Sequence, residues 1–164
     1  MYELKKLHGP SVGRALEKAK HYRLLNVPRL AESICLDVLD AEPDNQEALA
    51  MLVHALTDQF STPGVSVGRT KVEDVLPRVT NDYDRTYLEG IVAERRGIAA
   101  LKQDTPGYMV HGFFARAMDC YESAIALAPE GNEDAILRWN TCARILNRNP
   151  SIRAEEHRSL SMTD

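Results

Sequence analysis

The sequence predicts an all-α protein built from helical hairpins. Apolar residues recur at spacings of three and four along most of the 164 residues, and no segment shows the sustained alternation of a half-buried strand. Proline and glycine interrupt this pattern at short intervals, which divides it into separate helices. Because 44% of the residues are hydrophobic, the chain can bury one core. We therefore expect one domain over residues 1–150 and a polar, flexible tail over residues 151–164.

Proline and capping residues set the expected helix boundaries. Pro28 and Pro43 separate neighbouring helices, because proline disfavours helix in the residue before it and is tolerated in a first turn. Residues 44–47 place an N-cap and a carboxylate ahead of the third helix. Residues 61–70 are expected to form a loop. Pro77 is expected to shorten or bend the helix that follows this loop. The predicted helices span residues 12–25, 29–41, 46–59, 71–79, 83–102, 108–128 and 133–147.

One spaced signature occurs twice in the chain. A small residue is followed by a bulkier one, then by a small or branched one, and finally by proline, with the same intervals in both copies. Small residues let two helix axes approach closely, and the bulkier residue fills the volume between hairpins. We therefore expect these residues in the core and at turns. The copies are Ala31, Cys35, Val38 and Pro43, and Ala117, Tyr121, Ala124 and Pro129.

These residues make the chain resemble the tetratricopeptide repeat (TPR) family, in which an Ala, a Phe-like residue and a closing Pro mark the second helix of each 34-residue unit. Tyr22 matches the family's first-helix Tyr, and Gly90 and Gly97 match the two glycines of the third unit. The resemblance implies a right-handed α-solenoid of three hairpins with a C-terminal capping helix. The units are expected at residues 12–45, 46–82 and 83–131, and the cap at residues 132–147.

The interval between the two copies is longer than two units of the family. Ala31 and Ala117 are 86 residues apart, against about 68 for two 34-residue repeats, and most of the surplus lies between Gly90 and Ala117. The tip of this extended third hairpin is apolar. Either its two helices pack on each other and on the first loop, or they leave a patch for dimerisation or for a partner. The tip residues are Ile98, Ala99, Ala100, Leu101, Tyr108, Met109, Val110, Phe113 and Phe114.

Composition excludes several classes of function. A formal net charge of -4, with no cluster of Lys and Arg, argues against nucleic-acid binding. No apolar stretch approaches the roughly 20 residues that a membrane-spanning helix needs, and residues 1–10 do not resemble a signal peptide. Three cysteines without close spacing favour a reducing compartment and buried, inert thiols. We expect a cytoplasmic protein that does not bind membranes.

The residue patterns that could carry chemistry are weak. His54 and Asp58 have the spacing of metal ligands on a helix, but no third ligand is nearby in the sequence. His111 and Cys120 are too far apart along one helix to act as a base and a nucleophile. Residues 64–70 only superficially resemble a phosphate-binding loop, because the spacing is short and Arg replaces Lys. The sequence therefore predicts no catalytic residue, no cofactor and no metal.

The resemblance to TPR proteins implies a concave groove, lined by the first helix of each unit, that binds a peptide or helix of a partner. One TPR subclass grips a chaperone's C-terminal carboxylate with Lys, Asn and Arg, but here most of the matching positions differ, among them Leu16 and Leu88. We expect a non-enzymatic interaction module or adaptor. The groove residues are expected to be Leu16, Lys20, Arg23, Met51, His54, Asp58, Tyr87, Ile91, Glu94, Asn140 and Arg144.

Two alternatives to this function stay open. The first is a homo-oligomeric structural component, such as a homodimer formed through the apolar tip of the third hairpin. The second is a small-molecule sensor or enzyme with a pocket near His54, Asp58 and Tyr87.

Overall fold

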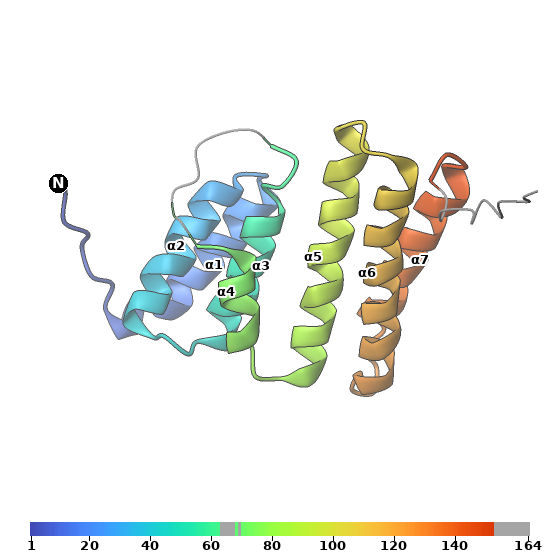
Figure 1. The fold of residues 1–164 in the computed structure, drawn as a ribbon. Helices are drawn as coiled ribbons and strands as arrows, with labels where there is room; N and C mark the ends of the chain where they lie inside the picture. The colour runs from blue at the N-terminus through green and yellow to red at the C-terminus, as the bar shows by residue number, and fades with distance from the viewer. Residues whose placement is uncertain (63–67, 69, 153–164) are drawn as a thin grey trace, which may run out of the picture.

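All regular structure in the described part of the chain, residues 1–62, 68 and 70–152 of a computed structural model, is helical (Figure 1). The predicted all-α class is confirmed. The predicted helix boundaries lie within two residues of the observed ones, except that the helix predicted for residues 71–79 ends as an α-helix at Val75 and continues as a 3₁₀ helix to Arg78. Two short 3₁₀ helices cover Gly9–Ser11 and Leu76–Arg78. The α-helices are α1 (Val12–Leu24), α2 (Pro28–Ala41), α3 (Gln46–Thr57), α4 (Val72–Val75), α5 (Asp82–Lys102), α6 (Gly107–Leu127) and α7 (Asp134–Arg148).

Local side-chain and backbone preferences explain where these helices begin and end. The side chain of Asn45 accepts a hydrogen bond of 2.9 Å from the backbone N–H of Ala48 and so caps α3, as predicted. Asn81 caps α5 in the same way. Asn26 lies in the turn between α1 and α2 at a φ of 57°, a left-handed conformation that Asn adopts more readily than most residues. Pro77 lies in the 3₁₀ segment that replaces any continuation of α4.

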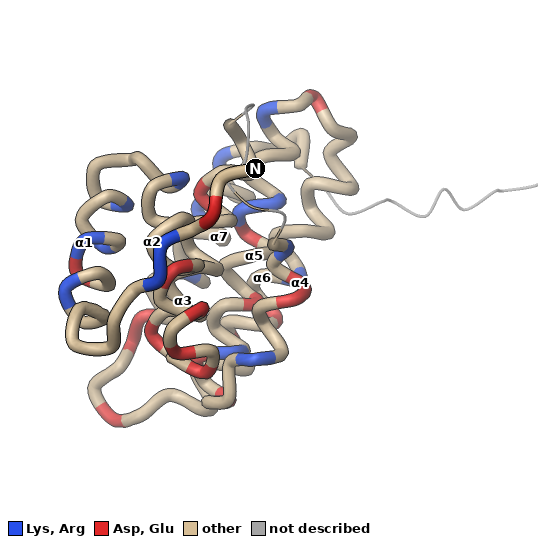
Figure 2. Tube along the Cα trace, turned by 90° about the vertical axis from the view of Figure 1, so that its left-hand side faces the viewer, with Lys and Arg blue, Asp and Glu red and all other residues tan. Residues whose placement is uncertain are grey.

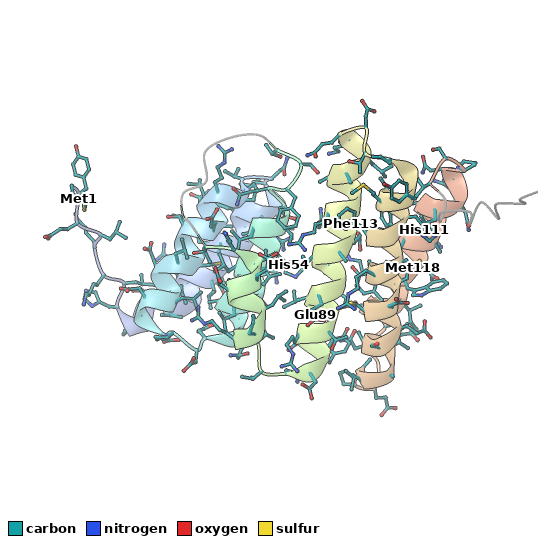
Figure 3. All side chains as sticks on the ribbon, viewed as in Figure 1. Met1, His54, Glu89, His111, Phe113 and Met118 are labelled. Atoms are coloured by element: carbon teal, nitrogen blue, oxygen red, sulfur yellow. The ribbon has the colours of Figure 1, made fainter. Side chains whose placement is uncertain are left out.

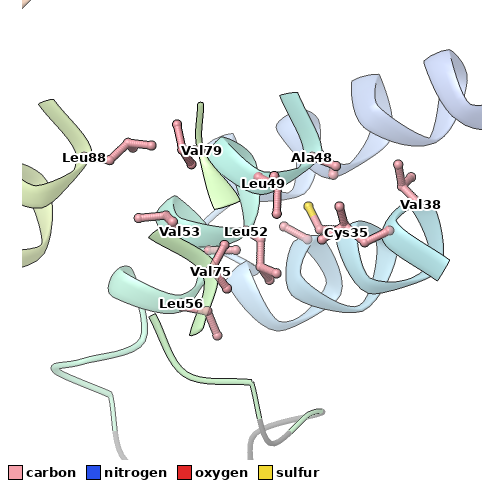
Figure 4. Packing of buried hydrophobic residues seen from close by; sticks show 14 of the residues in the cluster. Cys35, Val38, Ala48, Leu49, Leu52, Val53, Leu56, Val75, Val79 and Leu88 are labelled. Atoms are coloured by element: carbon pink, nitrogen blue, oxygen red, sulfur yellow. The ribbon is translucent and has the colours of Figure 1, made fainter. Parts of the chain in front are cut away.

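Consecutive helices pack against each other, and α3 and α5 join the two halves of the chain (Figure 1). One hydrophobic cluster is formed by α1 to α4 and includes Leu49 and Leu52 of α3 (Figure 4). A second cluster is formed by α5, α6 and α7. Leu88 of α5 belongs to the first cluster, whereas Ile91 of the same helix belongs to the second. The helix α5 is therefore shared by both cores.

The repeated signature lies in these cores, as predicted. Both copies of its first three residues are completely buried, at 0% exposure. The small residues allow close packing of α2 in the first cluster and of α6 in the second. The residues concerned are Ala31, Cys35 and Val38, and Ala117, Tyr121 and Ala124.

Two glycines of α5 make room for aromatic rings of α6. A Cβ atom at Gly90 would lie 2.5 Å from Cε1 of Tyr121, and one at Gly97 would lie 3.0 Å from Cε2 of Phe114. Both rings are completely buried. Glycine at these positions is therefore a packing requirement, because any side chain would displace a ring that has no free volume around it.

The apolar tip of the third hairpin is largely packed by its own two helices. Ala100 of α5 and Val110 and Phe114 of α6 are buried together in the second cluster. Tyr108 and Met109, at the start of α6, remain 48% and 46% exposed. The hairpin thus buries part of the apolar surface of its tip, whereas Tyr108 and Met109 remain partly exposed to solvent.

The prediction of a tail beginning at residue 151 is wrong for its first two residues. Ile152 is only 5% exposed and belongs to the second cluster. The backbone of Ser151 lies against Gly107, where a Cβ atom would be 2.1 Å from the Ser151 carbonyl oxygen. The polar composition of residues 151–164 predicted a tail, but the single apolar side chain of Ile152 packs into the core and holds the start of this segment there. Residues 153–164, and residues 63–67 and 69 of the predicted loop, lie outside the described part of the chain.

We expect Gly90→Ala to destabilise the fold by about 1–3 kcal/mol, because the added methyl group overpacks the buried Tyr121 ring. Urea unfolding monitored by circular dichroism measures this change. Gly112→Ala on α6 is the matched control, since nothing lies within 4 Å of the added Cβ. It should leave stability unchanged or raise it by up to about 1 kcal/mol through helix propensity. Equal effects of the two substitutions would contradict the packing role of Gly90.

Candidate functional site

Two adjoining hollows lie along α3. The first has a volume of about 370 Å³ and separates α3 from α1, with Lys20, Arg23 and Met51 among its lining residues. The second, of about 300 Å³, lies between α3, α5 and the start of α7. Because both hollows share Glu47, Ala50 and His54 of α3, we treat them as one groove and define it by these residues.

The groove exists because α3 is apolar on one side and mixed on the other. Glu47, Ala50 and His54 follow each other at spacings of three and four, which puts them on one face of the helix. Leu49 and Leu52 point into the first cluster instead and are completely buried (Figure 4). His54 is labelled in Figure 3, on the part of the molecule where α3 meets α5.

An ion-pair bridge connects three helices beside the groove. Arg23 of α1 donates from Nε to Oδ2 of Asp58, just after α3, at 2.8 Å. Arg95 of α5 places Nη2 at 3.5 Å from Oδ1 of the same carboxylate. The Asp58 side chain is 15% exposed, so water screens this bridge less than it screens an ordinary surface pair. Asp58 therefore holds two guanidinium groups from different helices close to one end of the groove.

His54 is held in its neutral form between these charges. Burial, followed by the positive charge of Arg23, lowers its pKa to about 4, although the Asp58 carboxylate opposes the shift. Its Nδ1 atom is buried and, within the described residues, has no hydrogen-bond partner. At neutral pH the groove thus contains an uncharged imidazole beside paired charges.

Three residues that the sequence predicted for the groove surface are buried instead. Leu16 is 4% exposed, Ile91 is 0% exposed and Glu94 is 2% exposed, so the prediction of a surface position is wrong for them. Each of them faces a neighbouring helix rather than solvent, because the helices pack more closely than an open groove along their full length would require.

Glu94 has a structural role in the second cluster. Its carboxylate accepts a hydrogen bond of 2.6 Å from the Tyr121 hydroxyl and one of 3.2 Å from Nη1 of Arg138 on α7. Burial and the neighbouring Glu94 carboxylate together raise the pKa of Tyr121 far above its usual range. The carboxylate therefore ties α6 and α7 to α5, and a buried charge is satisfied by two donors.

The other predicted groove residues separate into three places. Lys20, Arg23, Met51 and His54 line the first hollow together, and Tyr87 lines the second. Asp58 lies in the ion-pair bridge rather than in the lining of either hollow. On α7, Asn140 is half-buried and the exposed Arg144 lines a separate hollow with Arg148 and Asn149. The structure thus brings the residues from the first two units together and separates those of α7 from them.

Sequence reasoning missed several residues of this site. Arg95 lies three residues after Val92, which belongs to the first cluster, and this spacing could have indicated its approach to Asp58. Tyr83 stacks on Tyr87 at a centroid distance of 5.9 Å, and its hydroxyl donates to Oδ1 of Asn132 at 3.1 Å. Nothing in the local sequence indicated the contribution of Asn132.

Charge is distributed unevenly along the groove. The first hollow has Lys20 and Arg23 from α1, a helix with several basic positions (Figure 2). The second hollow has Glu47, Asp84 and Asp134, which lie in the first turns of α3, α5 and α7. Acidic residues are favoured at helix N-termini because they complement the helix dipole. The groove therefore has a basic part beside α1 and an acidic part beside the N-termini of the three other helices.

The three thiols are buried, as predicted, and lie away from the lining of the groove. Burial raises the pKa of Cys35 and of Cys142 to about 12 and also raises that of Cys120. A protonated, inaccessible thiol is a poor nucleophile and a poor metal ligand. In the described residues, no three His, Cys, Asp or Glu side chains converge in the manner of a metal site, and no helix is both long and apolar enough to cross a membrane.

Comparison with known proteins adds no neighbour, since no family model, curated protein or solved structure matches this chain.

We expect acid to destabilise the protein partly through His54. Its pKa of about 4 lies below the unfolded-state value near 6.5, so its contribution to stability is present above about pH 6.5 and is lost as the pH falls towards 4. At about 1.4 kcal/mol per pKa unit, the upper limit of this loss is about 3.5 kcal/mol. The free energy of unfolding, measured by urea titration between pH 7 and 4, should fall less in His54→Gln.

The exposed His21 on α1 provides the control for this measurement, because His21→Gln also removes one imidazole. The free energy of unfolding of this variant should fall as much as that of the wild type over the same pH range. If the free energy of unfolding had the same pH dependence in all three proteins, protonation of His54 would not contribute to the loss of stability in acid, and the prediction would be wrong.

Proposed function

We propose that this chain is a non-enzymatic protein-interaction module, an adaptor that binds a peptide or helix of a partner in the groove. The observation that carries the proposal is the pair of adjoining hollows that share Glu47, Ala50 and His54 and extend from α1 across α3 to α5. An elongated surface crossing several helices suits an elongated ligand better than a compact one.

The chemistry of the groove supports a polypeptide ligand. The half-buried Ala50 and Met51 offer apolar contacts, and the stacked pair of Tyr83 and Tyr87 adds aromatic surface with polar ends. Basic and acidic side chains flank these contacts in different parts of the groove. A partner segment with a few apolar anchors and charges of both signs would match this lining.

The packing of the signature residues supports a TPR-like solenoid of three hairpins and a capping helix as the scaffold. Gly90 and Tyr121 occupy matching positions of the family pattern, and they meet in the structure at the α5–α6 contact. The half-buried Trp139 of α7 packs on the second cluster, as a residue of a capping helix should. A cytoplasmic location is consistent with three reduced, buried thiols.

The proposal predicts that Ala50→Arg abolishes partner binding, because the long side chain would fill the region that the two hollows share. Ala126→Arg is the matched control, since Ala126 is exposed on α6, away from the groove. Purified, immobilised protein would be used to capture partners from an extract of native cells, with circular dichroism to verify folding. Loss of the same partners by both variants, or by neither, would contradict binding in the groove.

A second candidate function, homodimerisation through the third hairpin, is favoured by the exposure of Tyr108 and Met109. Both apolar side chains lie next to each other at the start of α6 and are nearly half exposed. A dimer contact there would remove them from water at roughly 25 cal/mol per Å² of apolar surface.

If this contact forms, light scattering should show a mass that rises towards twice 18.4 kDa with protein concentration. The double variant Tyr108→Glu, Met109→Glu should remain monomeric, because charged side chains would have to be buried in the contact. A wild-type protein that stays monomeric up to millimolar concentration would exclude the dimer.

A further inference from the structure

A cavity of about 640 Å³, larger than either hollow of the groove, opens between the end of α3, α4, the C-terminal half of α5 and the start of α6. We call it the outer cavity. Leu56 lines it and lies about 200° around α3 from His54, given the 100° that each helical residue turns. The outer cavity and the groove therefore lie on opposite sides of α3 and share no lining residue.

The outer cavity results from a mismatch in helix length. The 21 residues of α5 extend about 31 Å, at 1.5 Å per residue. The helix α4 and the 3₁₀ segment after it contain only 4 and 3 residues, or roughly 12 Å of helix. They cannot cover the second half of α5. Arg96 and Gln103 in that half line the cavity, together with the edges of the buried Ala99 and Ala100.

Seven of the sixteen residues that line the cavity are apolar. Phe60 follows α3, Val72 begins α4, Ala99 belongs to α5, and Met109 and Phe113 come from the first half of α6. Phe113 is labelled in Figure 3. Threonine and glutamine side chains add neutral polar groups to this lining. A volume of this size, in which apolar residues alternate with neutral polar and charged ones, is typical of sites for small molecules.

The charged residues of the lining are mostly cationic. They are Arg29, Lys71 and Arg96, with one acidic residue, Glu73, so their formal sum is 3 − 1 = +2. The whole chain has a formal net charge of -4. Arg96 bonds to Glu73 and also lies over the Phe60 ring, 5.8 Å from its centroid. Cationic side chains thus outnumber acidic ones beside the apolar part of the lining, and Arg96 is paired with Glu73, so Lys71 is the cation on which the selectivity is tested.

We propose that the outer cavity binds a small molecule with an apolar body and one anionic head. The apolar body is removed from water by the walls, and the head is attracted by the cationic lining. This site does not depend on the groove, so the two proposals stand or fall separately.

Three probes with the same ten-carbon body and different heads test the proposal: decanoate, 1-decanol and decyltrimethylammonium, each below its aggregation limit. Titration into the full-length, ¹⁵N-labelled protein is followed by NMR. Decanoate should bind saturably and shift the amide resonances of Ala99, Ala100 and Phe113. It should bind at least about fivefold more tightly than the cationic probe, because a charge pair at a partly exposed site contributes up to about 1 kcal/mol.

Variants with matched charge changes locate the site. Lys71→Glu reverses a charge of the lining and should weaken decanoate binding about fivefold or more. Lys102→Glu makes the same change at an exposed position of α5 outside the lining and should bind like the wild type. Met109→Trp, which adds bulk at a half-exposed wall residue, should weaken binding of decanoate and decanol alike.

Three results would overturn the proposal. They are the absence of saturable decanoate binding, equal affinity for the three probes, and shifts confined to groove residues such as His54 and Tyr87. Partner capture by the groove would remain intact in the first and second cases, which distinguishes this failure from a failure of the proposed function.

Discussion

The helix α5 has to be buried on two sides, and this constraint shapes most of the molecule. Leu88 and Val92 complete the cluster of α1 to α4, while Ile91 and Ala100 belong to the cluster of α5 to α7. A helix with two buried sides needs small residues wherever a neighbour comes close, and Gly90 supplies one beneath the Tyr121 ring. Hydrogen bonds from Tyr121 and Arg138 to Glu94 then fix α6 and α7 on that side. The two clusters therefore form one continuous row of helices rather than two independent domains.

The groove and the outer cavity follow from how the neighbours of α5 meet it. Towards the groove, α3 contacts α5 directly, and the Asp58 carboxylate bridges Arg23 and Arg95 across that junction. Towards the outer cavity, α4 is too short to cover α5, and the end of the long third hairpin extends beyond it. The groove thus has basic and acidic side chains in separate parts, whereas three of the four charged side chains of the outer cavity are cationic. The groove and the outer cavity therefore differ in charge.

The helices could be predicted from the sequence because their signals are local. Proline at residues 28 and 43 and the Asn45 cap mark boundaries without reference to the rest of the chain. The burial of Ile91 and Glu94 could not be predicted, because it depends on how closely α5 approaches α6 and α7. The contact between Tyr83 and Asn132 could not be predicted either, because it joins residues 49 positions apart and depends on how distant segments pack together. Ile152 shows the converse, since one apolar residue in a polar stretch has too little pattern to reveal that it is buried.

The three buried cysteines are natural probes of local unfolding. Cys35 lies in the cluster of α1 to α4, and Cys142 lies on α7 in the other cluster. Because burial holds both thiols protonated and covered, a thiol reagent reaches each of them only when its surroundings open. The labelling rates of Cys35 and Cys142 therefore measure separately how often each end of the row unfolds. Their ratio tells whether the shared helix α5 makes the two ends open together.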